Sequence, residues 1–159
     1  MSSSIFKIQA KVLKILAQPK RLEIIHLLRN QRLNVTEIYT MLGMSQANAS
    51  QHLMVLRAGG VVVTERDGKE MYYSLANPKI IEASDSIREW LLEQQRENLP
   101  SELSTPSLKD LLPIVTDPVC GMELSPLTAS FSGLVNGQVY YFCASGCHDK
   151  FMKNPATFL

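Results

Sequence analysis

Apolar residues in the N-terminal part of the chain recur mostly at helical spacing. The spacing of three, four, one and three positions between Ile5, Ile8, Val12, Leu13 and Leu16 predicts an amphipathic helix. A second helix is expected to start at Pro19, because a proline ring suits the first helical turn. We expect its buried side to consist of Leu22, Ile25 and either Leu27 or Leu28.

Two shorter helices follow, separated by a glycine. The first covers about residues 35–42 and is capped by Thr36 or Asn34. The second starts at Ser45, a good N-cap, and runs to Arg57 before a glycine pair. A short helix, a glycine turn and a second, polar helix form a helix-turn-helix arrangement.

A β-hairpin is predicted directly after these helices. The β-rich segments 61–66 and 69–75 flank Asp67-Gly68, and an Asp-Gly pair between such segments is a strong hairpin signal. A hairpin in this place completes the plan of a winged helix-turn-helix.

A long helix and a linker come next. Asn77 caps and Pro78 opens this helix, which extends to about Asn98. Residues 99–113 contain three prolines and three serines, so we expect a linker with one short helical turn at 107–112.

The tail, residues 114–159, predicts a second hairpin and a helix. Residues 130–142 hold two apolar segments around Asn136-Gly137, again a tight-turn signal. The helix is expected at 144–153, with Phe151 and Met152 facing inward. The chain is thus expected to be α+β, with a winged domain over 1–98 and a small second domain over 114–159.

The exposed face of the helix that starts at Ser45 carries short hydrogen-bonding side chains. Such side chains suit a recognition helix in the major groove, where Gln and Asn can bond adenine bidentately. Arg57, Arg66 and Lys69 are placed to contact phosphates. The candidate DNA-binding residues are Ser45, Gln46, Asn48, Ser50, Gln51, His52, Arg57, Arg66 and Lys69.

The alternative for this helix is an ordinary solvated face on a core helix. The agreement of turn, helix, hairpin and local charge favours DNA binding. Residues 1–69 hold ten Lys or Arg and four acids, a net +6, whereas residues 70–159 have a net −5. The overall charge of +1 therefore hides a basic N-terminal part.

Two histidines in this region have different expected roles. His52 can contact DNA or orient its helix through a local hydrogen bond, and the sequence leaves both open. His26 lies within an apolar helix and is expected to be a packed residue rather than a ligand.

Three segments, 17–28, 33–62 and 65–75, together resemble the ArsR/SmtB family of small bacterial repressors. The most specific residues are Ser45-Gln46, Ser50-Gln51-His52-Leu53, and Leu56 followed by Gly59. The resemblance covers about residues 5–98. It implies a homodimeric winged helix that binds a palindromic operator in double-stranded DNA and leaves it when an inducer binds.

The last helix of this domain suits a dimer on its own residues. It carries more apolar surface than one domain edge needs, so it can pack against its twin as well as against its own core. The residues concerned are Ile80, Ile81, Ile87, Trp90, Leu91 and Leu92.

The sensory sites that the resemblance would imply are missing from the repressor-like part. Residues 34–42 hold no cysteine or histidine, Asp85 and Glu89 have no histidine nearby, and residues 1–98 contain no cysteine. A receptor for a soft metal or an oxidant is therefore expected in the tail.

All three cysteines lie in the tail. Cys143 and Cys147 are one helical turn apart, and Cys120 lies on a glycine-containing turn that can approach Cys143. Three converging thiolates suit Cu(I), Ag(I), Hg(II) or As(III), whereas Zn(II) favours a fourth ligand, for which His148 and Asp117 are candidates. Because a domain of about 40 residues usually needs a metal or a partner for stability, a purely structural zinc is the alternative.

Two tail motifs resemble the YHS/TRASH family, small treble-clef-like modules of proteins that handle heavy metals. They are DPVCGM at 117–122 and YYFCASGCHDKFMKNP at 140–155. The resemblance covers most of residues 114–159 and implies that Cys120, Cys143 and Cys147 bind a metal ion.

Composition narrows the class of function. Apolar residues make up 45% and charged residues 19%, which is typical of soluble globular proteins. No apolar segment approaches the roughly 18 residues of a membrane span, and the N-terminal residues MSSSIFK lack the long apolar stretch of a signal peptide. We therefore expect a cytoplasmic protein without a membrane partner. We find no nucleophile–base pair or phosphate loop of an enzyme.

These patterns together predict a metal-responsive repressor that binds operator DNA as a homodimer and senses a thiophilic ion through its cysteines. One alternative is a thiol redox or sulfide sensor that uses Cys143 and Cys147. The others are a repressor with a purely structural zinc, and a metal-binding module tethered to DNA.

Overall fold

The chain forms two compact units, Met1–Ile81 and Glu82–Leu159, and helix α5 (Lys79–Arg96) crosses the boundary between them. The computed structural model describes residues 4–96, 115–124, 126 and 129–159, except for the side chains of 89 and 92–96. The expected linker and its helical turn at 107–112 lie outside the described residues. The domain limits 1–98 and 114–159 therefore stay a prediction.

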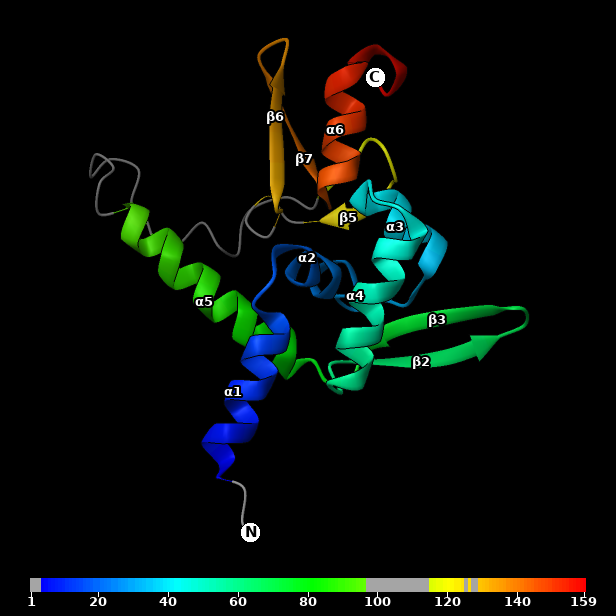
Figure 1. The fold of residues 1–159 in the computed structure, drawn as a ribbon. Coiled ribbons are helices and arrows are strands. Elements are labelled where there is room, and N and C mark those ends of the chain that lie inside the picture. Colours follow the sequence, from blue (N-terminus) through cyan, green and yellow to red (C-terminus); the bar gives the residue numbers. More distant parts are fainter. Residues whose placement is uncertain (1–3, 97–114, 125, 127–128) are drawn as a thin grey trace. The chain divides into compact units, whose positions relative to one another are not determined.

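The first unit has the predicted winged helix-turn-helix fold, in which α4 leads directly into the β2–β3 hairpin (Figure 1). Its elements are α1 (Ile5–Leu16), α2 (Pro19–Leu27), β1 (Leu33–Asn34), α3 (Val35–Leu42), α4 (Gln46–Ala58), β2 (Val62–Asp67) and β3 (Glu70–Leu75). The sequence pattern did not predict β1, because two residues are too short for a periodic signal. β1 pairs antiparallel with β3, which gives the sheet the order β1-β3-β2.

Local hydrogen bonds set the ends of the helix pair. Asn34 is the cap of α3: its Oδ1 accepts from the Glu37 amide at 2.9 Å, and the Glu37 carboxylate accepts from the Asn34 amide at 2.8 Å. Gly43 ends α3 with a φ of 63°, in the left-handed region that favours glycine. Ser45 caps α4 by accepting from the Asn48 amide at 3.2 Å.

The core of the first unit gathers apolar residues from α2, α3, α4, the β1-β3-β2 sheet with its adjoining residues, and the start of α5. Leu22 is an exception to the prediction: it is exposed, because it lies in the first turn of α2, whereas residues 24–28 carry that helix's buried side. The buried apolar residues are Ile24, Ile25, Leu27, Leu28, Leu33, Ile38, Leu42, Ala49, Leu53, Leu56, Val61, Val62 and Ile81.

The second unit joins two short antiparallel sheets and a helix. Its elements after α5 are β4 (Val115–Thr116), β5 (Glu123–Leu124), β6 (Phe131–Val135), β7 (Gln138–Phe142), α6 (Ser145–Lys153) and a 3-10 turn at Pro155–Thr157. The predicted hairpin is confirmed as β6–β7, and both Asn136 and Gly137 have positive φ, as a tight hairpin turn of the I′ kind requires.

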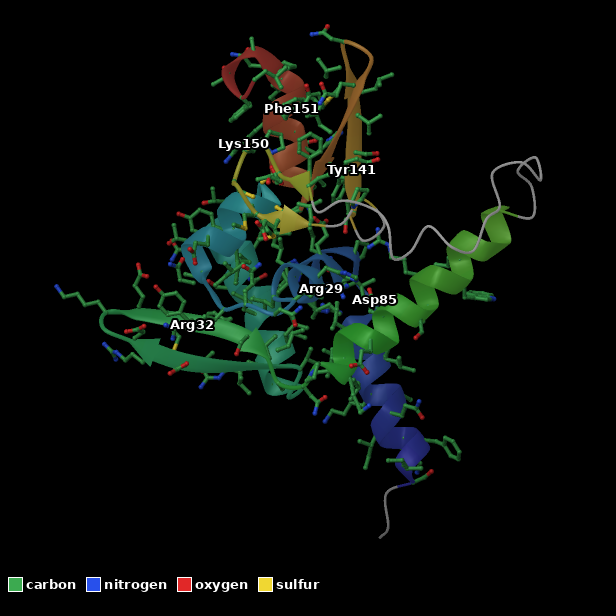
Figure 2. All side chains as sticks on the ribbon, turned by 180° about the vertical axis from the view of Figure 1, so that it is seen from behind. Arg29, Arg32, Asp85, Tyr141, Lys150 and Phe151 are labelled. Atoms are coloured by element: carbon green, nitrogen blue, oxygen red, sulfur yellow. The ribbon has the colours of Figure 1, made fainter. Side chains whose placement is uncertain are left out.

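Aromatic rings hold α6 on the β6–β7 hairpin. Phe151 of α6 points toward the hairpin (Figure 2), where its ring centroid lies 5.1 Å from that of Phe142 and 4.9 Å from that of Tyr140. Phe142 and Phe151 are fully buried. The expectation that Met152 also faces inward is wrong: it is exposed, because successive helical residues point about 100° apart and Phe151 takes the inner position.

The packing of α4 depends on its buried side chains, Ala49, Leu53 and Leu56. Shortening one of them tests this packing. We expect Leu53→Ala to lower the free energy of unfolding by about 2–5 kcal/mol, since Leu53 is fully buried and its loss leaves a cavity. Met54→Ala is the matched control on the same helix, because Met54 is exposed, and it should change stability by less than about 0.5 kcal/mol. Urea unfolding followed by circular dichroism measures both, and equal effects would contradict the packing described.

Candidate nucleic-acid interface and metal centre

Helix α4 separates its residues into a buried row and a polar row. Ala49, Leu53 and Leu56 are buried, which places Gln46, Asn48 and Gln51 on the exposed side. Ser45 is exposed and Ser50 is half-buried. The Ser45 hydroxyl is engaged in capping, so the amide side chains of Gln46, Asn48 and Gln51 are the ones whose bonding groups face outward.

His52 lies half-buried on α4, between the two rows. Burial, together with the positive charges of Arg21 and Lys20, lowers the pKa of His52 below its ordinary value. The imidazole is therefore mostly neutral at pH 7, with one donor and one acceptor nitrogen. Both predicted roles, DNA contact and helix orientation, are open to such a ring and stay predictions.

The three cationic candidates lie at the end of α4 and on the wing. Arg57 is exposed in the last turn of α4. Arg66 is exposed on β2, where its Nε donates to the Gly68 carbonyl at 3.3 Å, and Lys69 is exposed at the hairpin turn. All three can reach a ligand outside the protein.

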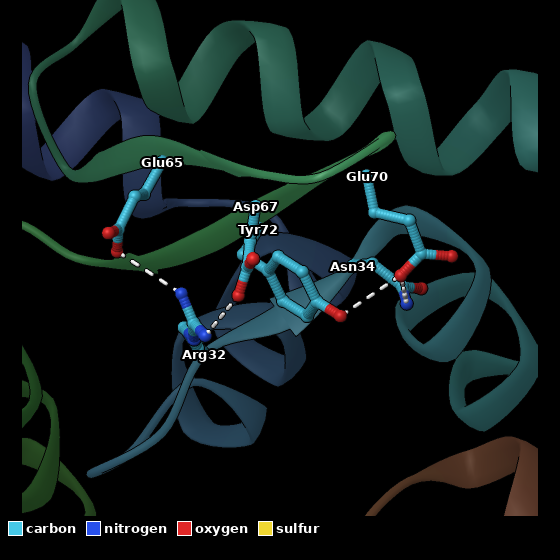
Figure 3. A network of polar contacts seen from close by, with 6 residues as sticks. All are labelled: Arg32, Asn34, Glu65, Asp67, Glu70 and Tyr72. Atoms are coloured by element: carbon cyan, nitrogen blue, oxygen red, sulfur yellow. Dashed lines mark hydrogen bonds and ion pairs between the residues drawn. The ribbon is translucent and has the colours of Figure 1, made fainter.

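A polar network on the wing involves a residue that the sequence analysis did not single out. Arg32, just before β1, contacts Glu65 and Asp67 of β2, and Asn34 and Tyr72 both donate to Glu70 (Figure 3). No sequence pattern signalled this network, because its members come from strands that are about 35 residues apart in the chain.

The three cysteine sulfurs of the tail lie together. Cys120 Sγ is 3.5 Å from Cys143 Sγ, which is 3.6 Å from Cys147 Sγ. Cys120 comes from the turn between β4 and β5, Cys143 follows β7, and Cys147 lies in the first turn of α6. With a carboxylate oxygen of Asp117 they form one group whose ligand atoms all lie within 4.8 Å of one another.

Asp117 organises this group through the backbone. Its side chain is fully buried and accepts three amide hydrogen bonds: Oδ1 from Val119 at 2.8 Å and from Cys120 at 3.4 Å, and Oδ2 from Cys143 at 2.8 Å. One carboxylate thereby joins the turn that carries Cys120 to the strand end that carries Cys143. An Asp before a proline is a turn signal, but only the fold brings Cys143 to it.

The protons of the three thiols are shared unequally. Hydrogen bonds from the Cys143 and Cys147 thiols lower the pKa of Cys120 to about 3. Hydrogen bonding to Cys120 raises the pKa of both Cys143 and Cys147. A cation that binds three thiolates must displace the protons that the thiols still hold.

The donor set fits a thiophilic cation. Metal–sulfur bonds of about 2.3 Å place the thiolates around one ion about 3.8–4.0 Å apart, so the observed sulfur separations need only a small expansion. Three thiolates are soft ligands, as Cu(I), Ag(I), Hg(II) and As(III) prefer.

His148 does not join this group. Its ring packs edge-on against Phe142, with centroids 5.5 Å apart, and lies 6.0 Å from the ring of Phe131. Its Nδ1 is 3.0 Å from the Asp149 carboxylate. Of the two predicted fourth ligands, only Asp117 is gathered with the sulfurs in the described part of the chain, and ligation by either stays a prediction.

Two family models match separate parts of the chain. Residues 18–64 match the helix-turn-helix model described as bacterial regulatory protein, arsR family, and residues 115–159 match the YHS domain. The described helices include none that is long and apolar enough to cross a membrane.

Curated relatives agree with the first match. The chain is 42% identical over 82 residues to the HTH-type transcriptional regulator Rv0081 of Mycobacterium tuberculosis, which is 51% of this chain and 72% of that relative. It is 44% identical over 72 residues to the transcriptional repressor PagR of Bacillus anthracis, which is 45% of this chain and 72% of PagR.

Solved structures show the same fold in the N-terminal part. The crystal structure of M. tuberculosis Rv0081 has a TM-score of 0.55 at 36% identity and covers 62% of this chain and 100% of that one. The homodimeric winged helix-turn-helix domain of Mb0332 from Mycobacterium bovis has a TM-score of 0.55 at 30% identity, over 58% of this chain and 86% of that one. The chain therefore belongs to the ArsR family of bacterial transcriptional regulators, with a YHS domain as its C-terminal part.

Proposed function

We propose that this protein is a cytoplasmic repressor that binds operator DNA as a homodimer and whose DNA affinity changes when a thiophilic metal ion binds Cys120, Cys143 and Cys147. The observation that carries the proposal is the cluster of three sulfurs, 3.5 and 3.6 Å apart, in a chain whose other part is an ArsR-type regulator. Relatives that are named as repressors, such as PagR, support the proposal that this protein represses transcription.

The proposed DNA interface consists of α4 and the wing. The exposed amide side chains of Gln46, Asn48 and Gln51 have the donors and acceptors that base edges in the major groove require. Arg57, Arg66 and Lys69 supply phosphate contacts, which position the helix without reading sequence. Ser45, Ser50 and His52 complete the proposed interface.

The proposed dimer uses α5. Ile81 packs in the core of the first unit, but Ile87, Trp90 and Leu91 are about half exposed on the same helix. Burying this apolar surface against a second copy is favourable, and a two-fold axis would place two copies of α4 one turn of DNA apart. The homodimeric state of the Mb0332 domain supports this arrangement.

The proposed ligand is Cu(I), Ag(I), Hg(II) or As(III), with Zn(II) as a less suitable ion. Three thiolates complete a trigonal site for the first four, whereas Zn(II) takes a fourth donor, for which Asp117 is better placed than His148. The carboxylate of Asp117 already accepts hydrogen bonds from three backbone amides. We therefore assign it mainly a structural role, in which it holds the segments of Cys120 and Cys143 together, and metal ligation is secondary.

Metal occupancy can alter DNA affinity only if the ion binds the DNA-competent and DNA-weak states with different affinities. We propose that residues 99–113, which join the two domains, change their conformation between these states. All the sulfur ligands lie outside the repressor-like part, so the metal signal has to reach that part from the tail.

The sulfur distances also favour a second candidate, a thiol redox sensor. Cys143 can form a disulfide with Cys120 or with Cys147 by losing two protons and two electrons to a peroxide, which is reduced to two waters. Release of DNA by peroxide that a chelator does not change would favour this candidate over the metal sensor.

Sequence reading by α4 can be tested with one substitution. On a duplex that the wild-type protein enriches from a random pool, Gln51→Ala should weaken binding by about 1–3 kcal/mol, because a base contact is lost. Arg57→Ala is the matched comparison and should weaken binding to this duplex and to an unrelated one alike. Fluorescence anisotropy at fixed salt measures both, and an equal effect of Gln51→Ala on the two duplexes would rule out base reading.

The role of α5 can be tested by placing a charge on its apolar face. Trp90→Glu should convert the dimer to a monomer, because a carboxylate is too costly to bury in an apolar interface. Leu134→Glu, at another exposed apolar position, on β6, should leave the dimer intact. Light scattering after gel filtration gives the mass of the protein in solution. A Trp90→Glu variant that is still a dimer would contradict the proposed interface.

The sensory role can be tested by metal titration. The reduced wild-type protein is expected to bind one ion per chain, and Cys143→Ser should lose at least 10-fold in affinity because it removes the central sulfur. Ser132→Ala, an exposed position on β6, is the control. Gel shifts with Cu(I), Ag(I), Hg(II), As(III) and Zn(II) give the response. If an ion binds but none changes operator affinity, the site is structural or belongs to a tethered metal-binding module.

A further inference from the structure

The wing has more acidic than basic side chains. Between Val62 and Leu75 it carries Glu65, Asp67 and Glu70 against Arg66 and Lys69. A surface with surplus negative charge repels the phosphates of DNA. Arg66 and Lys69 therefore serve better as phosphate contacts when part of this negative charge is offset from elsewhere.

Arg32 supplies one positive charge from across the sheet. Its Nη2 lies 2.7 Å from Asp67 Oδ2, its Nη1 lies 3.3 Å from Glu65 Oε2, and its guanidinium carbon lies 4.7 Å from the centre of the Tyr72 ring (Figure 3). Tyr72 belongs to β3, the middle strand, and pairs with Glu65 on β2. The side chain of Arg32 thus extends from the β1 edge over the middle strand to the far strand.

Strand alternation then separates the charges. Glu65 and Asp67 are two residues apart on β2, so both lie on the face that Arg32 covers, and Arg66 between them lies on the other face. Glu65 and Asp67 both pair with Arg32 on one face of the hairpin, so the side chain of Arg66 carries a positive charge on the opposite face.

The third carboxylate is held from the same edge. Asn34 Nδ2 and the Tyr72 hydroxyl each donate to Glu70 Oε2 at 3.0 Å. Asn34 is also the N-cap of α3, so the network joins the wing to the first helix of the helix-turn-helix. Each of the three wing acids therefore has a partner on β1, on β3 or in the residue just before β1.

Folding stability does not explain this arrangement. The side chains of Arg32, Glu65 and Asp67 are 44%, 75% and 58% exposed, and ion pairs with such exposure add little to stability. An exposed pair does change the electrostatic field that an approaching polyanion meets.

We propose that Arg32 is a positioning residue for DNA binding: it offsets part of the negative charge of Glu65 and Asp67 and holds the wing so that Arg66 and Lys69 face the DNA backbone. The inference rests on the proposed DNA interface. Arg32 acts through the wing and does not itself contact phosphate, which separates it from the proposed phosphate contacts Arg57, Arg66 and Lys69.

A double-mutant cycle on the full chain tests this role. Arg32→Gln should weaken binding to the enriched duplex about tenfold, because two carboxylates are freed on the wing. In a Glu65→Gln/Asp67→Asn background, the same change should cost less than about twofold. Arg32→Lys, which keeps the charge, should retain most of the affinity. Lys153→Gln removes the same charge from α6 and should have no effect.

The outcomes separate this inference from the proposed function. An equal cost of Arg32→Gln in both backgrounds would mean a direct phosphate contact and overturn the inference, and so would no cost in the wild-type background. Thermal unfolding followed by circular dichroism checks that each variant is folded. If the wild-type protein enriches no duplex from the pool, the proposed DNA binding itself is wrong, whatever the effect of the Arg32 variants.

Discussion

The burial of one face of α4 is the constraint on which the first unit depends. Ala49, Leu53 and Leu56 are fully buried, and the helix cannot rotate without exposing them. This fixed rotation determines which polar residues face outward, including Gln46 and Gln51. The stability of the core and the presentation of the candidate recognition surface are therefore two consequences of the same packing.

The second unit is stabilised in a different way, because it has only a small hydrophobic core. Among its described residues the buried apolar side chains are Phe142, Ala144, Cys147 and Phe151. The buried carboxylate of Asp117 adds a polar constraint by accepting amides from both chain segments that carry Cys120 and Cys143. A ligand bound to the sulfurs would add its binding free energy to the folding of so small a unit.

In both units a polar side chain joins segments that are distant in sequence. Asp117 joins the turn of Cys120 to the end of β7, and Arg32 joins the edge strand to the wing. Asp117 is buried, so its hydrogen bonds determine local structure strongly, whereas Arg32 is exposed, and its effect lies in the electrostatic field. The burial of the polar side chain thus decides whether its contacts between distant segments act on folding or on the approach of a charged ligand.

Much of this architecture followed from local signals. Gly43 and Asn136-Gly137 marked turns that the backbone confirms with positive φ, and the cysteine spacing predicted a cluster that the fold brings together. Such signals act over a few residues, where backbone sterics and helical period decide the outcome. The sequence by itself thus determined the helices, the two hairpins, the two folds and the residue types of both candidate sites, but not the two-residue strands β1, β4 and β5. Only the tertiary structure decided the exposure of Met152, the separation of His148 from the sulfurs and the pairing of Arg32 with the wing, because each depends on contacts between segments that local periodicity does not relate.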